Sequence, residues 1–398
     1  MASIKKEKQP TLNQENPSMN KDFVLFCAGE DSGDILGAEA VSAINLWGVE
    51  AIGIGGPRMQ KEGLKAIGHF DDFAISGFKD VLTHYSQLSR YLKLLKKTLE
   101  NPHCVALVLI DYPGFNMRLV EYCKNLSKPI LYIAPPQIWA WKSKRAYRLQ
   151  NVTLGVLYDY EQEAYKRFGC ESLKIENPFL KDAISLVEKK ASKENTFLFL
   201  PGSRRHQLHR NMTLFIKIAK DLHRRNPELQ IKFVVSRNSL INEIKKWNIE
   251  FEQIMVPENS TERAVLFSKA QGVVATPGSG ILEVSLVGTR ALACARIDPL
   301  TYFLGKLLVK TKFFTLPNLL LLKKIVPEYL SPVSFFYKKE VSSIVEELQK
   351  TEKEDYSSQA SALQKKCEGT PIKCLALEFL MDVLNRDSEQ GRLSIRRN

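Results

Sequence analysis

The 398-residue sequence lacks the features that mark membrane-spanning and secreted chains. No apolar run approaches the roughly 18 residues that a helix needs to cross a bilayer. The densest apolar stretch, residues 316–322, contains a proline and an asparagine. The first 21 residues are polar and include no apolar core of a secretory signal. We therefore expect neither a transmembrane helix nor a signal peptide.

Cysteine and histidine are present, but not in patterns that build disulfide or metal sites. The seven cysteines are scattered, odd in number and never spaced C-x-x-C. The six histidines show no metal-ligand spacing either. We expect no disulfide framework and no metal site, and a reducing cytoplasmic compartment.

The common signatures of nucleotide-binding enzymes and hydrolases are missing as well. The sequence has no G-x-G-x-x-G motif in dinucleotide-binding context, no Walker lysine and no G-x-S-x-G motif, which disfavours nicotinamide enzymes, P-loop ATPases and α/β-hydrolases. Positive charge is abundant instead: 57 Lys and Arg against 44 Asp and Glu give a net charge of +13. This excess favours an anionic partner, which is nucleic acid, a lipid headgroup surface or a phosphorylated substrate.

Short apolar runs alternate with amphipathic segments along the chain. The runs occupy residues 23–28, 49–54, 105–110, 129–133, 196–200, 231–235 and 272–276. Fully apolar runs of this length are typical of parallel strands that helices cover on both faces. We therefore expect an α/β fold with two doubly wound Rossmann-like domains, a cleft between them and C-terminal helices.

The changes in composition suggest five segments. We expect a disordered leader at 1–20, an N-terminal domain at 21–185, a C-terminal domain at 186–340, C-terminal helices at 341–385 and a flexible basic tail at 386–398.

Two loops of the first domain carry carboxylates directly after predicted strands, where ligands of open parallel sheets bind. Glu30 follows residues 23–28 in a glycine-containing turn, and a capped turn alone does not explain a carboxylate there. Asp111 follows residues 105–110, where partial burial would raise its pKa and suit a general base. An aspartate that only begins a turn with Pro113 and Gly114 explains Asp111 about equally well.

Two loops of the second domain have the composition of an anion site. Ser203 and Arg204 follow a strand and a glycine and precede a helix, and helix amides with a guanidinium suit a diphosphate. Gly278 and Ser279 repeat this arrangement after a later strand. Glu283 is expected in the first turn of the next helix, where it would accept the two ribose hydroxyls or only complement the helix dipole. Together these residues predict a nucleoside-diphosphate site.

Two basic segments remain open to several interpretations. Residues 137–145 mix tryptophan with lysine and arginine, and suit stacking with phosphate contacts, a sugar-phosphate or lipid-facing patch, or core packing, which is favoured for the segment alone. Residues 303–330 combine apolar residues with Lys306, Lys310, Lys312, Lys323 and Lys324. That mixture is typical of a membrane-surface segment, although a buried helix with a solvated lysine face is the common alternative.

Six stretches, in the same order, resemble the lipid-A-disaccharide synthase family of glycosyltransferases. They are residues 28–37, 56–63, 111–116, 137–141, 200–204 and 307–320. The resemblance implies a GT-B type, inverting, metal-independent hexosyltransferase without a cofactor. Such an enzyme transfers 2,3-diacylglucosamine from UDP-2,3-diacylglucosamine to 2,3-diacylglucosamine 1-phosphate (lipid X). The products are the β-1,6-linked lipid A disaccharide 1-phosphate and UDP.

The resemblance also implies that residues 21–185 form the acceptor or catalytic domain and residues 186–340 the UDP-sugar-binding domain. It further implies roles for matching residues. Asp111 would deprotonate the acceptor 6-hydroxyl, while Glu30 and Asn318 would orient sugars or phosphate across the cleft. The UDP-binding set would be Ser203, Arg204, Gly278, Ser279, Glu283 and Asn318. The five lysines named above would meet acyl chains and headgroups at the inner membrane of a Gram-negative bacterium, with the enzyme peripheral on its cytoplasmic side. A homodimer is compatible with the resemblance.

The chain departs from the family pattern at Gly114, Asp159, Asn177 and Gln207. An alternative is a GT-B transferase or an epimerase that acts on a soluble UDP-sugar. A nucleic-acid-binding protein ranks last, because the positive charge is spread over both domains and not gathered in one stripe.

Overall fold

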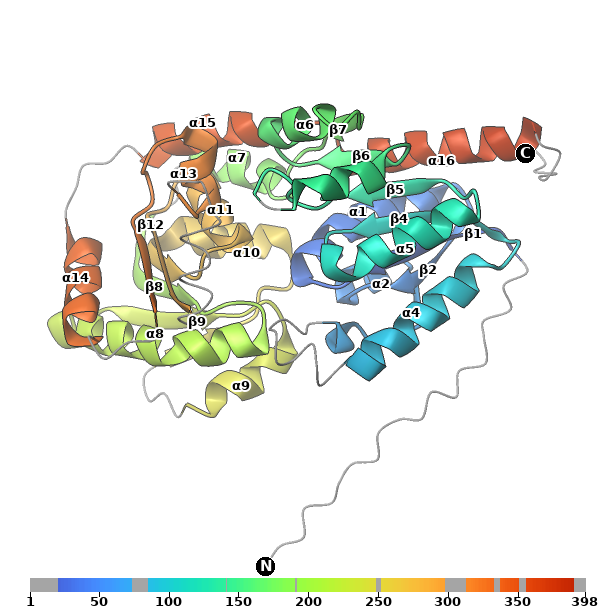
Figure 1. The fold of residues 1–398 in the computed structure, drawn as a ribbon. Helices are drawn as coiled ribbons and strands as arrows, with labels where there is room; N and C mark the ends of the chain where they lie inside the picture. The colour runs from blue at the N-terminus through green and yellow to red at the C-terminus, as the bar shows by residue number, and fades with distance from the viewer. Residues whose placement is uncertain are drawn as a thin grey trace, which may run out of the picture.

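The computed structural model describes residues 21–73, 85–140, 142–189, 192–247, 252–297, 313–332, 337–350 and 356–389. Two sheets, each with helices on both faces, lie next to each other (Figure 1). The strand order is β3-β2-β1-β4-β5-β6-β7 in one sheet and β10-β9-β8-β11-β12-β13 in the other. All the described strand pairs are parallel. We call the first sheet with its helices the N-lobe and the second the C-lobe.

The strands of the N-lobe are β1 (Phe23–Ala28), β2 (Glu50–Ile54), β3 (Lys65–Ala66), β4 (Cys104–Ile110), β5 (Ile130–Ile133), β6 (Thr153–Val156) and β7 (Ser172–Lys174). Those of the C-lobe are β8 (Glu194–Leu200), β9 (Gln230–Val234), β10 (Glu252–Met255), β11 (Ala270–Ala275), β12 (Ala291–Ile297) and β13 (Glu328–Pro332). Every residue of β1 and β4 is buried, as their apolar sequences predict for central strands.

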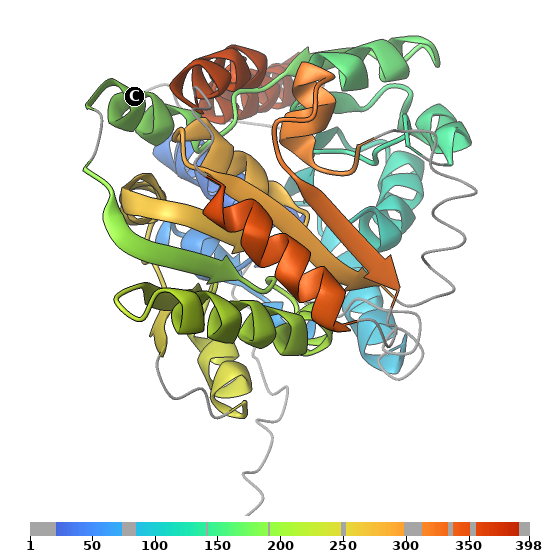
Figure 2. The same ribbon diagram turned by 90° about the vertical axis from the view of Figure 1, so that its left-hand side faces the viewer.

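Helices cover both faces of each sheet. In the N-lobe they are α1 (Asp31–Leu46), α2 (Pro57–Lys61), α4 (Tyr85–Leu99), α5 (Pro113–Asn125), α6 (Asp159–Lys166) and α16 (Ile372–Glu389). In the C-lobe they are α7 (Leu180–Lys189), α8 (Arg205–Arg225), α9 (Ile241–Lys245), α10 (Ser260–Lys269), α11 (Ser279–Leu286), α13 (Leu316–Leu321), α14 (Tyr337–Gln349) and α15 (Tyr356–Cys367). Figure 2 shows α8 and α14 side by side against one face of the second sheet.

Two crossings between the lobes fall within the described residues, and they lie side by side. The Asn177 amide donates to the Cys367 carbonyl at 3.0 Å, and Ile175 pairs with Thr370. A Cβ on Gly369 would lie 2.5 Å from the backbone of Ile175, so the second crossing needs a glycine there. Asn177, one of the departures from the family pattern, accepts the Phe179 amide through its side chain at 3.0 Å, just before α7.

These crossings correct two of the expected domain boundaries. Phe179, Leu180 and Ala183 belong to the core of the C-lobe, so the first crossing comes before residue 180 and not at 185. The C-terminal helices do not form a unit of their own. Helices α14 and α15 pack in the C-lobe, while α16 returns to the N-lobe and packs against α1.

The strand order places the ligand-binding ends. It reverses between β1 and β4 in one sheet, and between β8 and β11 in the other. Loops diverge at such a reversal and leave a crevice beyond the carboxyl ends of the strands. The loops that carry Glu30, Asp111, Ser203 and Ser279 all start there.

Candidate functional site

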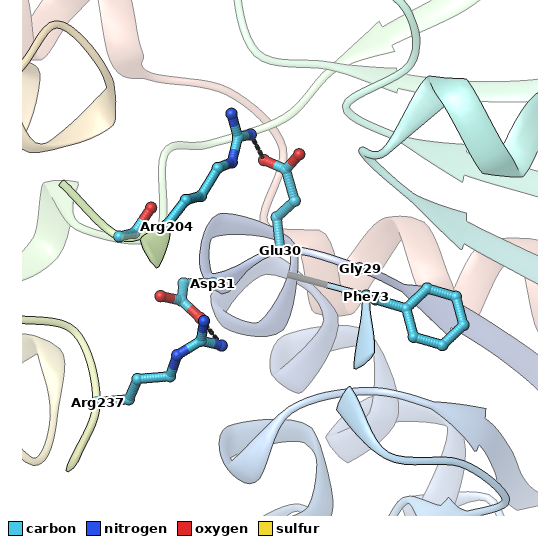
Figure 3. Close-up of a pocket in the computed structure, with 7 residues that line it drawn as sticks. Gly29, Glu30, Asp31, Phe73, Arg204 and Arg237 are labelled. Carbon is cyan, nitrogen blue, oxygen red and sulfur yellow. Dashed lines mark hydrogen bonds and ion pairs between the residues drawn. The ribbon is translucent and has the colours of Figure 1, made fainter. Parts of the chain in front are cut away.

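A pocket between the lobes receives residues from both of them (Figure 3). It is lined by Gly29, Glu30, Asp31, Phe73, Ser203, Arg204 and Arg237. Residues after β1 therefore face residues after β8 and β9. The structure thus brings together the predicted site residues Glu30, Ser203 and Arg204.

Asp111 follows β4 and is held in an unusual backbone conformation. Asp111 and Tyr112 have φ values of 47° and 48°, in the left-handed region, which costs free energy for a residue with a side chain. The Asn116 side-chain amide and the Tyr132 hydroxyl both donate to the Asp111 carbonyl, at 2.8 and 2.9 Å. The Ser32 hydroxyl donates to the Asp111 carboxylate at 3.2 Å. These contacts keep the carboxylate at the mouth of the sheet.

The surroundings of Asp111 make it a stronger base than an ordinary aspartate. Burial raises the pKa of its carboxyl to about 6, and the negative charge of Glu30 acts in the same direction. The Tyr112 amide, the Ser32 hydroxyl and the Arg204 charge oppose this rise. The group is therefore ionised at neutral pH, yet its pKa is close enough to 7 to accept a proton from a hydroxyl in a transition state.

Glu30 lies at the N-cap position of α1, where its side chain makes no capping hydrogen bond. It reaches across the pocket and pairs with the Arg204 guanidinium (Figure 3). Gly29 beside it allows close packing of the two N-lobe loops, because a Cβ there would lie 2.5 Å from the Tyr112 ring. The predicted acceptor-side carboxylate and the predicted diphosphate-binding arginine thus contact each other.

The two predicted anion loops of the C-lobe are neighbours. The Thr276 amide donates to the Leu200 carbonyl at 3.0 Å, and a Cβ on Gly280 would lie 3.2 Å from the Leu200 side chain. Arg204 is the N-cap residue of α8, and Gly278 that of α11. The positive ends of the two helices therefore lie close together, which suits an anion with two phosphates.

We call the loops after β8 and β11 the anion cradle. Gly202 and Gly278 shape these loops in different ways. Gly202 has a φ of 120°, and a Cβ there would lie 2.7 Å from the Gln207 side chain. Gln207, a departure from the family pattern, thus fills the space behind the loop. A Cβ on Gly278 would meet nothing within 4 Å, so the start of α11 has open space in front of it.

Glu283 differs from the expectation in its place and in its partner. It is the fifth residue of α11, in the second turn and not the first. Its side chain is buried, and its carboxylate lies 2.6 Å from the Arg263 guanidinium of α10. A ribose would have to share the carboxylate with Arg263, so the ribose-binding role of Glu283 stays a prediction.

Asn318 has a structural role in place of the predicted contact with UDP. Its side chain has no exposed surface. It accepts the amides of Ile325 and Val326 and donates to the Val326 carbonyl and to Glu328, at 2.8–2.9 Å. The amide group therefore ties the segment after α13 to β13, and we no longer place it among the ligands of UDP.

Of the five predicted membrane-facing lysines, Lys306, Lys310 and Lys312 lie outside the described residues. Lys323 and Lys324 are exposed directly after α13. Leu322, directly before them, has 82% of its surface exposed, and Phe314, just before α13, has 45% exposed. We call Phe314, Leu322, Lys323 and Lys324 the α13 edge. Within the described ranges, no helix is long and apolar enough to cross a bilayer.

The tryptophan-rich segment packs against α6. The Trp139 ring lies edge-on to Tyr160 at 5.0 Å, which favours the core-packing interpretation, while Trp141 lies outside the described residues. Next to Tyr160, Glu161 accepts the Leu157 and Tyr158 amides at 3.0 and 3.2 Å, and burial raises its pKa to about 7. Asp159, another departure, pairs with Lys174 at 2.8 Å.

Sequence reasoning missed the residues that position Asp111 and the second contact between the lobes. Ser32, Asn116 and Tyr132 hold the aspartate, and Asp31 pairs with Arg237 across the pocket. Ser32 and Asn116 lie inside stretches that resemble the family, but only the pairing of β1 with β4 shows that they converge.

Comparison with known sequences decides the family. The family model for lipid-A-disaccharide synthetase matches residues 24–382. The chain belongs to the lipid-A-disaccharide synthetase family. Lipid-A-disaccharide synthase of Trichlorobacter lovleyi is 31% identical over 329 residues, which are 78% of this chain and 85% of that protein. Lipid-A-disaccharide synthase 1 of Legionella pneumophila is 30% identical over 325 residues, covering 78% of this chain and 84% of that protein.

Solved structures confirm the fold of this lipid-A-disaccharide synthetase family member. S. aureus MnaA in a co-structure with UDP aligns with a TM-score of 0.57 at 11% identity, over 95% of this chain and 99% of that one. The UDP-GlcNAc 2-epimerase of Methanocaldococcus jannaschii, in complex with UDP-GlcNAc and UDP, gives 0.53 at 11% identity, over 86% and 97%. The predicted arrangement of two doubly wound α/β domains is therefore confirmed.

Proposed function

We propose that this chain is an inverting, UDP-sugar-dependent lipid-A-disaccharide synthase. The donor is UDP-2,3-diacylglucosamine, the acceptor is 2,3-diacylglucosamine 1-phosphate, and the products are the β-1,6 disaccharide 1-phosphate and UDP. The observation that carries the proposal is the arrangement around the pocket. A general-base candidate on the N-lobe, Asp111, feels the charges of Glu30 and of Arg204, and Glu30 pairs with Arg204 of the anion cradle on the C-lobe. The chain matches this family over residues 24–382.

The reaction is a single displacement. The acceptor 6-hydroxyl gives its proton to the Asp111 carboxylate as its oxygen attacks the anomeric carbon of the donor. The bond between that carbon and the β-phosphate oxygen breaks on the opposite face, so the configuration inverts and UDP leaves with the electron pair. Arg204, Ser203 and the amides that begin α8 and α11 stabilise the charge that develops on the diphosphate.

Glu30 has two tasks in this proposal. In the structure, its carboxylate forms an ion pair with the Arg204 guanidinium. It thus lies where we propose that a phosphate of UDP binds. When UDP takes Arg204, Glu30 is released toward the acceptor side, where a carboxylate can accept sugar hydroxyls. Its negative charge already contributes to the raised pKa of Asp111.

The acylated substrates require contact with a membrane surface. The α13 edge offers exposed apolar side chains next to two lysines, which suits acyl chains and anionic headgroups. We place the enzyme in the cytoplasm, peripheral on the inner membrane of a Gram-negative bacterium. The α13 edge lies in the C-lobe, which also carries the cradle for the donor.

The test is incubation of the purified protein with both acylated glucosamine substrates in detergent, followed by mass measurement of the lipid product. We expect an acylated disaccharide monophosphate and one UDP per disaccharide. Formation of a product from UDP-N-acetylglucosamine alone, equally fast without lipid or detergent, would favour the soluble UDP-sugar transferase or epimerase and contradict the proposal.

A further inference from the structure

A second ion pair joins the lobes beside the one between Glu30 and Arg204. Arg237 follows β9 in the C-lobe, and its guanidinium lies 3.1 Å from the Asp31 carboxylate at the start of α1 (Figure 3). The Ser236 hydroxyl donates to the other oxygen of Asp31. The Arg237 guanidinium also lies 5.9 Å from the centroid of the Phe70 ring in the N-lobe. A side chain of the C-lobe is therefore seated in the N-lobe.

The two ion pairs differ in their place relative to the anion cradle. The cradle consists of the loops after β8 and β11, which are neighbouring strands. Strand β9 lies on the other side of β8, so Arg237 stands one strand farther from α11 than Arg204 does. From this order of strands we expect a diphosphate on the cradle to take Arg204 from Glu30 and to leave Asp31 and Arg237 paired. Both side chains are about 85% buried, at 14% and 13% exposed, which strengthens the pair.

The Asp31–Arg237 pair lies far from the two chain crossings, about which the lobes would rotate. The two chain crossings lie near β7, at the top of Figure 1, whereas α9, which follows the Arg237 loop, lies at the bottom. A contact far from the crossings resists opening more effectively than one beside them.

We infer that Asp31 and Arg237 form a clasp that keeps the lobes closed while Arg204 changes its partner from Glu30 to the substrate. Both are positioning residues, which act by holding Asp111 at reacting distance from the donor. The inference rests on the proposed function only in taking the pocket as the reaction site. Because a misplacement of about 1 Å can cost about a hundredfold in rate, loss of the clasp lowers kcat more than it weakens UDP binding.

Charge reversal tests the clasp. The variants are Asp31→Arg, Arg237→Asp and the double variant, with Asp31→Asn as a milder change. Each single variant is expected to lower kcat at least tenfold, because coupling between close charge pairs exceeds about 1.4 kcal/mol, or one decade. The dissociation constant of UDP in calorimetry stays within about twofold. The double variant regains most of the lost kcat, because the opposite charges meet again.

A matched control separates the clasp from a general effect of losing an ion pair. Asp221 pairs with Arg225 at 3.0 Å within α8, so Asp221→Asn removes the same charge without touching the N-lobe. Asp221→Asn is expected to leave kcat unchanged. If the charge-reversed variants fail to fold, the kcat of Asp31→Asn is compared with that of Asp221→Asn. Thermal unfolding shows that both of these variants are folded.

Three results would overturn the inference. The first is a double variant no better than its worse parent. The second is a large rise in the UDP dissociation constant for Arg237→Asp, which would make Arg237 a substrate ligand. The third is a radius of gyration of the ligand-free Glu30→Gln/Asp31→Asn variant in solution scattering equal to that of Glu30→Gln, because the clasp predicts a larger one once the Glu30–Arg204 pair no longer joins the lobes. Scattering needs no substrate, so it judges the clasp even if the wild-type chain makes no disaccharide.

Discussion

At the scale of single residues, Asp111 combines strain with a raised pKa. Its left-handed backbone is held by Asn116 and Tyr132, and its carboxylate is partly shielded from water and close to Glu30. Each feature costs stability and serves the chemistry, as functional sites commonly show. The pKa of Asp111 therefore determines how both the free energy of unfolding and kcat depend on pH.

The raised pKa predicts how stability depends on pH. The Asp111 pKa is about 6 in the folded protein and near its ordinary value in the unfolded chain. Ionisation thus disfavours the folded state, fully above pH 6 and not at all below about pH 4. Asp111→Asn should raise the free energy of unfolding at pH 8 by about 1–3 kcal/mol, and the gain should shrink between pH 6 and 4. Urea unfolding at several pH values measures it, and a gain that grows toward low pH would contradict the prediction.

The same pKa predicts the pH dependence of the rate. A general base works only when it is ionised, so kcat should fall about tenfold per pH unit below pH 6 and level off above it. Ser32→Ala removes a hydrogen bond that lowers the pKa of Asp111. We expect the acidic limb to move to higher pH in this variant. An unchanged limb in Ser32→Ala would show that another group titrates.

At the scale of elements, the loops after β1 and β4 depend on one glycine. Gly29→Ala would place a Cβ 2.5 Å from the Tyr112 ring, next to Asp111. We expect a loss of about 1–3 kcal/mol in stability from this overpacking, together with reduced kcat.

Gly114→Ala is the matched control for Gly29→Ala. A Cβ on Gly114 in the first turn of α5 meets nothing within 4 Å. It should therefore be neutral or stabilise the protein by up to about 1 kcal/mol, through helix propensity. Thermal unfolding of both variants distinguishes a packing requirement at Gly29 from a general need for glycine. Equal losses of stability in Gly29→Ala and Gly114→Ala would contradict the packing requirement.

The fully apolar strands could be predicted from sequence, but other elements could not. Strands β1 and β4 stand out because every residue is buried, and β8 and β11 because residues 196–200 and 272–275 form buried, nearly all apolar runs. Strand β12 was missed because it is rich in alanine and contains Arg296, which pairs with Glu340 of α14. Strands β3 and β7 are only 2 and 3 residues long, too short for a periodic signal.

The site residues within each lobe could be predicted from the sequence, but the contacts between the lobes could not. Glu30, Asp111, Ser203 and Arg204 were expected because they follow apolar strands. The pairing of Glu30 with Arg204 joins residues 174 apart in sequence and depends on how the lobes face each other. The role of Asn318 was misjudged, because its neighbours in space belong to a turn that no sequence pattern reveals.

At the scale of the whole molecule, the α13 edge predicts binding to anionic membranes. Each lysine near such a surface contributes about 1 kcal/mol, so replacing Lys323 and Lys324 by serine should lower the vesicle partition coefficient about 30-fold. Lys245 and Lys246, another exposed pair at the end of α9, serve as the control. Sedimentation with vesicles containing anionic phospholipid measures the partition. An equal loss for both pairs would show only an effect of net charge.

The central claim is that the N-lobe supplies the general base and the C-lobe binds UDP. One paired measurement tests this claim most directly. The UDP dissociation constant and kcat are determined for Asp111→Asn and Arg204→Gln. Asp111→Asn should lower kcat by about 10²–10⁴-fold and leave UDP binding within about twofold of the wild type. Arg204→Gln should weaken UDP binding at least tenfold, since it removes a charge-assisted contact to the diphosphate. Loss of UDP binding in Asp111→Asn, or unchanged UDP binding in Arg204→Gln, would contradict the account.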